Sequence, residues 1–465
     1  MSKRAQERKP PDKIVQTSGQ SFTVQPWDRR DAIFLLPILL VAALLRLLNL
    51  DYMEFKGDEA GNLFMASQLA SGASFPLVGI PSSIQTYNPP LFTYLMALPL
   101  FFSRNPVVAA GFIALLNCAA VALLYAFCRR FFSRRAAVIA AGFFAVNPWA
   151  VLYSRKIWQQ DLLPLFVVGF FYCLFAVVCE GRRKPLVGCF AFLAAMTQLH
   201  LSSIYYLLVL GMALAWFRPR VNWGYYAGGI GVALLFYAPY IAFDIINQGY
   251  NSGMYLQTLE WPSRFHLEAF IAPFVLGSAL GFIRLLDWPI LDLLQGLLIA
   301  AGAAYLFSRW RERNHLIPLL WLGVPSLFLS VSKVDLPLHY FIFLYPIQFL
   351  LLGILADALV PWLGTKRKAL GYGAAALLVL LAAYQLQSSV SFVTSVKDHE
   401  NLARTEYGPP FRYRVEEIRK LVNEGVVEPE RVQEKLLEGK SPQSAHKYDF
   451  PATAYIVVNL AAIPY

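Results

Sequence analysis

Charged residues are scarce in this chain. Only 15% of its 465 residues are Asp, Glu, Lys or Arg, whereas 57% are hydrophobic. A soluble protein of this size would carry roughly a quarter charged residues. Apolar runs of about 18 or more residues recur, each long enough to cross a hydrocarbon core of ~30 Å. The composition therefore excludes a soluble protein and predicts an all-α polytopic membrane protein whose surroundings are the lipid bilayer.

Motifs for several kinds of chemistry are also absent. The sequence has no metal-ligand spacing, no Gly-rich phosphate loop, no Ser-His-Asp or Cys-His arrangement and no soluble nucleotide-binding domain. Its five cysteines lie in or beside apolar runs, so no disulfide framework is indicated. No cleavable signal peptide is expected, because residues 1–30 are polar and the first apolar run is typical of an uncleaved anchor. An outward-facing enzyme of this kind would receive its group donor through the membrane.

The net charge of +11 does not indicate a nucleic-acid partner, because the basic residues gather in short loops. Under the positive-inside rule such loops are cytoplasmic. The clusters are Arg129, Arg130, Arg134 and Arg135; Arg182, Arg183 and Lys184; Arg218 and Arg220; Arg309, Arg311 and Arg313; and Lys366, Arg367 and Lys368. All fall on one side if the N-terminus is cytoplasmic and about eleven spans follow. The predicted spans are 31–50, 106–127, 136–153, 162–179, 186–199, 201–217, 222–243, 288–307, 315–331, 338–360 and 369–388.

This topology divides the chain into three parts. Residues 1–30 form a cytoplasmic tail, residues 31–388 a transmembrane domain, and residues 389–465 a small extracytoplasmic domain. Two long outer loops, 51–105 and 244–287, interrupt the transmembrane domain. We expect the chemistry on this outer side.

Shorter patterns suggest structure within the outer segments. The first loop contains an expected amphipathic helix at 59–70. In the C-terminal domain, helix patterns at 412–423 and 428–437 precede a β-like stretch at 454–458.

Asp58 and Glu59 follow the first span by about ten residues. Carboxylates near hydrocarbon lose hydration, so they are usually paired, solvated in a cavity or functional. One interpretation is structural: Asp58 caps a helix whose dipole favours negative charge, and Glu59 lies in its first turn. The other is catalytic: Asp58 is a general base that deprotonates an acceptor, and Glu59 orients the acceptor or the partner chain.

Arg155, Lys156 and Asp161 form a second cluster at the outer end of two spans. The positive-inside rule does not explain cations there. They could hold the phosphate of a lipid carrier, since guanidinium offers bidentate contacts to phosphate oxygens. Asp161 would then be a second carboxylate of the catalytic site. The structural alternative is an interfacial pair of Arg155 with Asp161, anchored by Trp158.

Other outward residues could join the same site, although each alone could be a satisfied polar residue. His200 lies at an outer helix end and could face the cavity. Arg46, near the outer end of the first span, is expected to snorkel to the interface. The remaining candidates are Arg264, His266, Arg284, Lys333, His339 and Tyr340.

Several motifs together resemble the family-39 glycosyltransferases of the GT-C superfamily, which include protein O-mannosyltransferases and the lipid A aminoarabinose transferase. The resemblance covers roughly residues 30–240 well and 315–360 loosely. Relatives often have His in place of Asn88. The motifs are Gly57-Asp58-Glu59-Ala60; Asn88-Pro89-Pro90-Leu91 with Tyr94 and Leu98-Pro99-Leu100; Leu124-Tyr125 with Arg129-Arg130-Phe131-Phe132; Asn147-Pro148-Trp149 with Ser154-Arg155 and Asp161; and His339-Tyr340-Phe341 with Tyr345-Pro346.

The resemblance implies a GT-C fold and a polyprenyl-phosphate-linked sugar donor. A hexose or pentose would pass to a glycan, lipid or protein acceptor at the outer face of the cytoplasmic (inner) membrane, usually with inversion. Asp58 would be the catalytic base and Asp161 the second acidic position. The resemblance leaves open whether a divalent metal takes part, because metal use varies in the superfamily. The predicted phosphate ligands are Arg155, Lys156, Arg264 and His339, and the predicted cavity residues are Tyr87, Asn88, His200 and Tyr340.

Elementary chemistry is consistent with this mechanism. Polyprenyl phosphate leaves as a stabilised anion, so no general acid is needed. One carboxylate base and a group of cations that hold the phosphate are sufficient for an inverting transfer. The alternative function is a transporter or flippase of lipid-linked sugars. Transporters tend to show repeated halves and charged helices at mid-membrane depth, which this sequence lacks. A membrane scaffold without catalysis would leave the two charged clusters unexplained.

Overall fold

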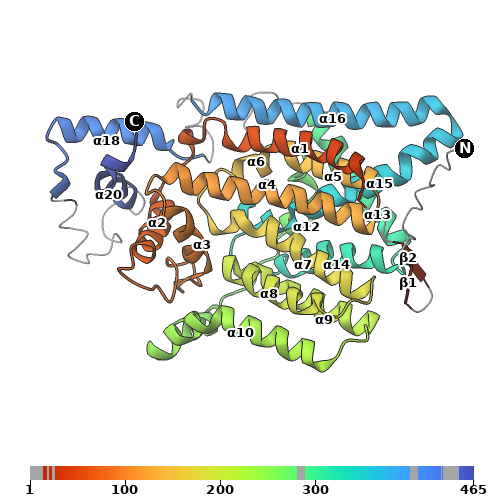
Figure 1. Cartoon of the computed structure of the whole chain (residues 1–465), viewed down its shortest axis with the longest axis horizontal. Helices are drawn as coiled ribbons and strands as arrows, with labels where there is room; N and C mark the ends of the chain where they lie inside the picture. Colours follow the sequence, from red (N-terminus) through yellow and green to blue (C-terminus); the bar gives the residue numbers. More distant parts are fainter. Residues whose placement is uncertain are drawn as a thin grey trace, which may run out of the picture.

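Helices make up nearly all of the protein in the computed structural model (Figure 1). It describes residues 27–279, 289–397, 407–430, 432 and 450–464, together with the backbone of 14–17 and 20–23. The latter are two short strands, β1 (Ile14–Thr17) and β2 (Gln20–Thr23), paired antiparallel with Ile14 opposite Thr23. The prediction of an all-helical membrane protein is confirmed, and this hairpin is the one addition among the described residues.

The helices follow the predicted spans closely. Each of the eleven predicted segments contains a helix, and the first loop contains the predicted one as α2. In chain order they are α1 (Arg29–Leu47), η1 (Leu50–Tyr52), α2 (Gly57–Ala70), α3 (Leu91–Leu100), α4 (Pro106–Phe131), α5 (Arg134–Val146), α6 (Pro148–Tyr153), η2 (Gln159–Leu162), α7 (Leu163–Val178), α8 (Pro185–Leu199), η3 (Leu201–Ile204), α9 (Tyr205–Phe217), α10 (Trp223–Ile246), α11 (Tyr250–Thr258), α12 (Glu268–Val275), α13 (Pro289–Ser308), α14 (Arg313–Leu329), η4 (Leu338–Leu344), α15 (Tyr345–Lys366), α16 (Lys368–Ser395), α18 (Phe411–Asn423), α20 (Phe450–Val458) and η6 (Leu460–Ala462).

Within the described residues, six stretches of helix are long and apolar enough to cross a membrane. They are Pro106–Phe131, Gln159–Val178, Trp223–Ile246, Pro289–Ser308, Leu338–Lys366 and Lys368–Ser395. Shorter apolar helices lie between them, at Leu91–Leu100, Pro185–Leu199 and Leu201–Phe217. The chain is therefore a multi-pass membrane protein.

The predicted third span is broken near its outer end. Asn147 ends α5 and begins α6, because its side-chain oxygen accepts a hydrogen bond from the backbone N–H of Ala150 at 2.9 Å. Pro148 follows at the first position of α6, where a missing N–H does no harm. The break turns the chain toward the segment 154–161, which carries the second charged cluster.

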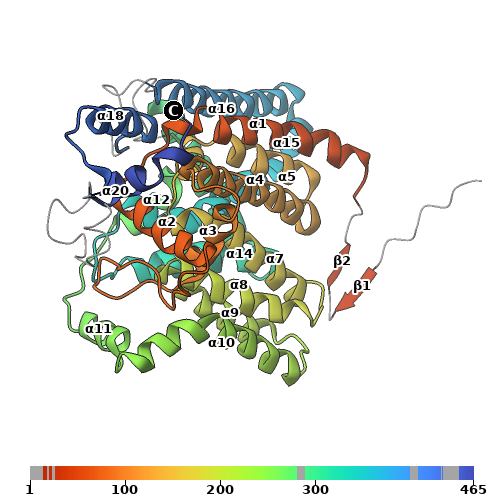
Figure 2. The same cartoon turned by 60° about the vertical axis from the view of Figure 1, so that its left-hand side comes forward.

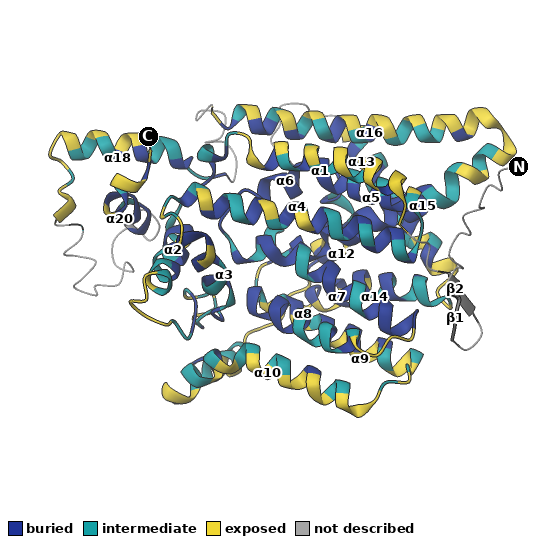
Figure 3. Cartoon of the chain, in the orientation of Figure 1, coloured by how far each residue is buried: buried dark blue, intermediate teal, exposed yellow. Residues whose placement is uncertain are grey.

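The interior of the bundle is built around α15. Every residue from Tyr345 to Ala356 is buried, as expected for a helix that is apolar on all sides. It packs along α5, α13 and α16, and α7 packs between α4 and α8. The outer faces of α10 and α16 carry exposed apolar side chains (Figure 3). Such faces suit contact with lipid.

One end of the bundle carries a lobe formed by α2, α3, α18 and α20 (Figures 1 and 2). The prediction of a β-like stretch at 454–458 is wrong, because these residues belong to α20. Packing overrides their strand propensity: the ring of Tyr455 lies 5.0 Å from that of Phe64 and 5.9 Å from that of Phe55. The helix predicted at 412–423 is confirmed as α18, whereas most of 428–437 lies outside the described residues.

Candidate active site

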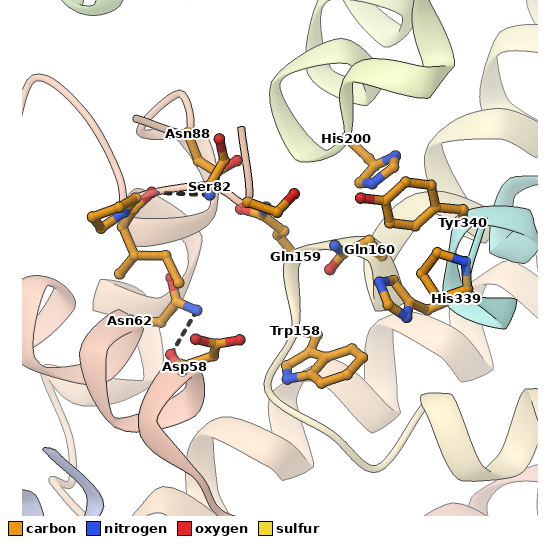
Figure 4. Close-up of a pocket in the computed structure, with 14 residues that line it drawn as sticks. Asp58, Asn62, Ser82, Asn88, Trp158, Gln159, Gln160, His200, His339 and Tyr340 are labelled. Carbon is orange, nitrogen blue, oxygen red and sulfur yellow. Dashed lines mark hydrogen bonds between the residues drawn. The ribbon is translucent and has the colours of Figure 1, made fainter. Parts of the chain in front are cut away.

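A cavity of about 310 Å³ opens where the lobe meets the helical bundle. It lies between α2, the loop before α3, the segment before η2, the start of η3 and the start of η4 (Figure 4). Asp58 is the one Asp, Glu, Lys or Arg among its lining residues. The lining residues are Asp58, Asn62, Ile80, Pro81, Ser82, Ser83, Asn88, Trp158, Gln159, Gln160, His200, Pro337, His339 and Tyr340.

Asp58 is brought to the cavity by the first turn of α2. The helix begins at Gly57, and the exposed Asp58 is its second residue. The backbone oxygen of Asp58 accepts a hydrogen bond from Nδ2 of Asn62 at 2.9 Å (Figure 4). Free N–H groups and the helix dipole at this end favour a negative charge. The fold thus presents the Asp58 carboxyl group at the cavity wall, next to the N-terminal end of α2.

Glu59 has a different environment, since it is fully buried and does not line the cavity. Its Oε2 accepts a hydrogen bond from the backbone N–H of Lys56 at 2.9 Å, which satisfies the start of α2. Its Oε1 has no hydrogen-bond partner. Burial, together with the nearby charge of Glu54, raises the pKa of Glu59 to about 7. The helix-start interpretation of the acid pair therefore fits Glu59, whereas Asp58 is exposed at the cavity.

Aromatic rings form the opposite wall. The ring of His339 lies 5.0 Å from that of Trp158 and 4.9 Å from that of Tyr340, edge to face in both cases. The ring of His200 lies 4.6 Å from that of Tyr340, and its Nδ1 is 2.6 Å from Oγ of Ser202. His200, His339 and Tyr340, all predicted from the sequence as site residues, thus come together at one cavity.

The loop before α3 closes the cavity through Asn88. Both its backbone N–H and its Nδ2 donate to the carbonyl oxygen of Ile80, at 3.0 and 2.9 Å. Gly79 donates in return to the carbonyl oxygen of Asn88 at 2.6 Å, and a Cβ on Gly79 would lie 3.1 Å from the oxygen of Pro89. This close approach folds residues 80–83 over the cavity.

Tyr87 was predicted as a cavity residue, but it is not among those that line the cavity. Its ring packs against Phe243 at 5.3 Å and Tyr250 at 5.8 Å. Its backbone N–H donates to Oδ1 of Asn251 at 2.9 Å, so Tyr87 fastens the loop to α10 and α11.

Asp161 is buried behind the cavity wall. Its Oδ2 accepts a hydrogen bond from the backbone N–H of Trp158 at 3.2 Å, and its Oδ1 has no hydrogen-bond partner. Its backbone oxygen accepts from Nδ2 of Asn117 at 2.9 Å. Asp161 therefore shapes the turn that presents Trp158 to the cavity.

Lys156 is also buried and lies close behind the same wall. Its ammonium is 3.1 Å from Oε1 of Glu54 and 3.7 Å from the centroid of the Trp158 ring. A cation at this distance over an indole face is attracted by the ring. Lys156 thus supplies positive charge next to the cavity, with Trp158 between them.

Arg155 is fully buried and does not line the cavity. One terminal nitrogen donates to the carbonyl oxygens of Leu45, Arg46 and Leu48 at 3.1, 3.1 and 2.7 Å, and the other donates to that of Asn49 at 2.8 Å. A guanidinium there satisfies the free carbonyls at the end of α1. The structural alternative for this cluster, a pair of Arg155 with Asp161, is not found, because the described contacts include no ion pair between the two side chains.

Arg46 likewise donates hydrogen bonds to the free carbonyl groups at the end of another helix. It is fully buried and donates to the carbonyl oxygens of Ala145 and Phe144, at 2.8 and 3.2 Å, at the end of α5. The prediction that Arg46 snorkels to the interface is therefore wrong. The prediction did not consider that the last carbonyl groups of a neighbouring helix, α5, need hydrogen-bond donors, which the guanidinium of Arg46 supplies.

The other predicted cations that the structure describes do not line the cavity. Arg264 pairs with Asp335 at 3.6 Å, and both side chains are largely exposed, at 71% and 89%. Lys333 donates to the carbonyl oxygen of Leu259. His266 pairs with Glu268 at 2.7 Å. Arg284 falls outside the described residues.

Sequence reasoning missed Glu54 and most of the neutral polar lining. Glu54 is fully buried, although it lies four residues before Asp58 in the same acidic loop, which was the available signal. No sequence signal distinguishes the other missed residues, because amides and hydroxyls are common in loops. They are Asn62, Ser82, Ser83, Gln159 and Gln160. In the part of the chain that the structure describes, no group of three or more His, Cys, Asp or Glu could hold a metal ion.

Part of the chain that forms this site is similar to a known protein family. Residues 87–243 match the family described as dolichyl-phosphate-mannose-protein mannosyltransferase. The predicted family resemblance is confirmed. The matched segment runs from the loop before α3 to α10, and it contains every cavity residue from Asn88 to His200. The family consists of membrane glycosyltransferases that depend on a lipid-linked sugar. No curated protein sequence matches the chain.

The fold is similar to those of solved GT-C glycosyltransferases. ArnT from Cupriavidus metallidurans in the apo state has a TM-score of 0.54 at 17% identity, over 80% of this chain and 77% of that one. The same protein bound to undecaprenyl phosphate has a TM-score of 0.54 at 16% identity, over 92% and 74%. Archaeal oligosaccharyltransferase AglB from Archaeoglobus fulgidus, in complex with an inhibitory peptide and a dolichol-phosphate, has a TM-score of 0.53 at 12% identity, over 88% and 59%. These likenesses establish a GT-C-like fold.

Proposed function

We propose that this protein transfers a sugar from a polyprenyl-phosphate carrier to an acceptor hydroxyl, with Asp58 as the general base. The observation that carries the proposal is that Asp58 is the one carboxylate among the described residues that line the cavity, and that it is exposed there. A base must reach the acceptor proton directly or through one water. Asp58 lines the cavity that an acceptor would enter, whereas the buried Glu59 and Asp161 support the structure around it.

The cavity lining suits a sugar. Trp158 and Tyr340 offer ring surfaces, and Asn62, Ser82 and Gln160 offer neutral hydrogen-bonding groups. Small-molecule sites combine apolar walls with a few polar groups in this way. His339 can contact the carrier phosphate, with the charge of Lys156 behind Trp158. Arg155 and Arg264 receive no such role in this proposal, because Arg155 holds the end of α1 and Arg264 is exposed and does not line the cavity.

The arrangement of carboxylates supports inversion. A retaining double displacement needs a nucleophilic carboxylate about 5 Å from its partner across the substrate. Glu59 and Asp161 do not line the cavity. A single displacement with one base and a good leaving group needs only Asp58 on the acceptor side.

The proposal includes the topology. The chain would cross the membrane about eleven times with a cytoplasmic N-terminus, and the lobe of α2, α3, α18 and α20 would lie on the extracytoplasmic face. Eleven helices at the predicted segments support this, as do the basic clusters at their opposite ends. The cavity lies next to the lobe, so the acceptor would approach from outside the cell.

A reconstituted assay tests the function. Purified protein in nanodiscs is given a panel of polyprenyl-phosphate sugars and an envelope extract as acceptor, and released polyprenyl phosphate is measured. Acceptor-dependent release that disappears in Asp58→Asn supports the proposal and names the sugar. Movement of labelled lipid across liposomes without donor consumption would replace the transferase with a transporter.

A further inference from the structure

The chain segment after α16 returns to the first outer loop and pairs with it. Phe411 donates its backbone N–H to the oxygen of Met53 at 2.7 Å, and Phe55 donates to the oxygen of Pro409 at 3.3 Å. Glu54 lies between these two bonds, opposite Pro410 in an antiparallel bridge. Residues 407–411 therefore add a short strand-like edge directly beside Glu54.

Glu54 is held by this segment on one side and by two lysines on the other. The backbone N–H of Gly408 donates to its Oε2 at 2.6 Å, and its own backbone N–H donates to the hydroxyl oxygen of Tyr407 at 3.0 Å. Its Oε1 lies 2.9 Å from Nζ of Lys56 and 3.1 Å from Nζ of Lys156. Burial opposes ionisation, but Lys156 and Lys56 hold the pKa of Glu54 below its usual range.

The contacts continue from Glu54 to the cavity. Lys156 places its ammonium 3.7 Å from the ring centroid of Trp158, and Trp158 lines the cavity together with Asp58. A buried ammonium needs a counter-charge. Without Glu54, Lys156 would lose its one ion-pair partner among the described contacts and would have to move or lose its charge.

We propose that Glu54 is a positioning residue for the active site and that residues 407–411 hold it in place. The segment thereby keeps the ammonium of Lys156 under Trp158 and so fixes the cavity wall that faces Asp58. The C-terminal part of the chain then belongs to the catalytic machinery rather than to a separate acceptor-binding module. The activity arm of the test below rests on the proposed function, and the other two arms do not.

The first arm is a double-mutant cycle on thermal unfolding with Glu54→Gln and Lys156→Gln. Glu54→Gln leaves the buried Lys156 without its ion-pair partner among the described contacts, and Lys156→Gln leaves the buried Glu54 with Lys56 alone. Each change should therefore lower the unfolding temperature by several degrees. The double variant should lower the unfolding temperature by clearly less than the sum of the two single changes, because neither buried charge is then present. Additive losses would overturn the link between the two residues.

The second arm tests the segment 407–411. A Cβ on Gly408 would clash with Cε of Lys56 and would lie 3.1 Å from Cδ of Glu54, so Gly408→Ala crowds the side chains of the ion cluster itself. Hydrogen exchange at residues 156–161 should become faster in this variant. The matched control is Glu416→Gln, in the same C-terminal region but paired with Arg412 on the exposed side of α18. Unchanged exchange at 156–161 in folded Gly408→Ala would overturn the proposal.

The third arm measures transfer with the donor that the wild type accepts. Glu54→Gln and Gly408→Ala should raise KM for the donor by about tenfold or more, the equivalent of ~1.4 kcal/mol in transition-state binding. Glu54→Asp, which keeps the charge, should recover part of the loss. Wild-type kinetics in both variants would overturn the positioning role. A wild type that transfers no sugar would contradict the proposed function instead, and the first two arms would still decide this inference.

Discussion

Asp58 and Glu59 are neighbours in the chain, but only Asp58 reaches the cavity. Asp58 is exposed at the cavity wall, and Glu59 is fully buried with one oxygen on the backbone N–H of Lys56. Successive residues of a helix point about 100° apart, so one turn can serve two purposes. The acid pair therefore divides into a carboxylate that lines the cavity and a buried one that holds the start of α2, and the two should respond differently to mutation.

We predict that Asp58→Asn removes transfer and leaves donor binding intact. The amide keeps the size of the side chain but cannot take a proton, and a positioned general base contributes about 10²–10⁴-fold to a rate. Turnover of lipid-linked sugar and binding of undecaprenyl phosphate are measured in parallel. Asp51→Asn is the matched control, because Asp51 lies in the same loop but pairs with Arg412. Full turnover in Asp58→Asn would remove Asp58 from the mechanism.

We predict that Glu59→Gln keeps transfer activity and changes how stability depends on pH. The folded-state pKa of Glu59 is about 7, above its ordinary value of 4.5. Between these values the folded protein holds a proton that the unfolded chain releases, so stability falls as pH rises through this window and levels off above it. An amide stays neutral, so the variant should lack this decline.

The measurement is the unfolding temperature of the wild type and the variant at about pH 5.5 and about pH 8. The unfolding temperature of the variant should rise relative to that of the wild type at the higher pH. Only the wild type must then ionise a buried carboxyl group or keep it protonated at a free-energy cost. Equal curves at both values, or a loss of activity as large as that of Asp58→Asn, would contradict the environment of Glu59 described here.

The sequence was sufficient to predict where the helices lie and to name several residues that line the cavity. Long apolar runs and short basic loops led to eleven segments, each of which contains a helix, because hydrophobic length is a local property. Asp58, Asn88, His200, His339 and Tyr340 were named before the structure and all line one cavity. Asp58, Asn88, His339 and Tyr340 belong to the motifs of the family resemblance, and His200 was named from its place at an outer helix end. Spacing alone could not show that these residues converge.

The partners of buried charges could not be predicted, because they are set by tertiary packing. Arg155 was predicted to bind phosphate, but its guanidinium donates to carbonyls that lie more than a hundred residues earlier in the chain. Glu54 was not noticed, although its contacts with Lys156 and Gly408 join three distant segments. The helix α20 was mistaken for a strand because Ile456 and Val457 have high strand propensity.

We predict that removing the guanidinium of Arg155 destabilises the fold more than it weakens donor binding. Arg155→Met deletes four hydrogen bonds to the carbonyls of residues 45–49, and losing buried charged hydrogen bonds of this kind should cost ~2–4 kcal/mol. The unfolding temperature should fall, while the folded fraction binds undecaprenyl phosphate with wild-type affinity. Arg264→Met, on an exposed side chain, should change the unfolding temperature little. A normal unfolding temperature with lost binding would restore Arg155 as a phosphate ligand.

We predict that the packing of α20 on α2 is needed for donor turnover as well as for stability. The Tyr455 side chain is fully buried against Phe55 and Phe64, and its hydroxyl donates to the carbonyl oxygen of Arg104 at 3.0 Å. Tyr455→Ala removes the ring and leaves a cavity between α20 and α2. Truncating a buried aromatic side chain typically lowers the free energy of unfolding by ~3–5 kcal/mol. Because α2 carries Asp58, its first turn should lose its fixed position, and turnover should fall together with the unfolding temperature. Tyr455→Phe keeps the ring and removes one hydrogen bond, so it should retain most of both. If Tyr455→Ala instead changed only which acceptor is used, with donor turnover and stability intact, the C-terminal region would act as a separate recognition module.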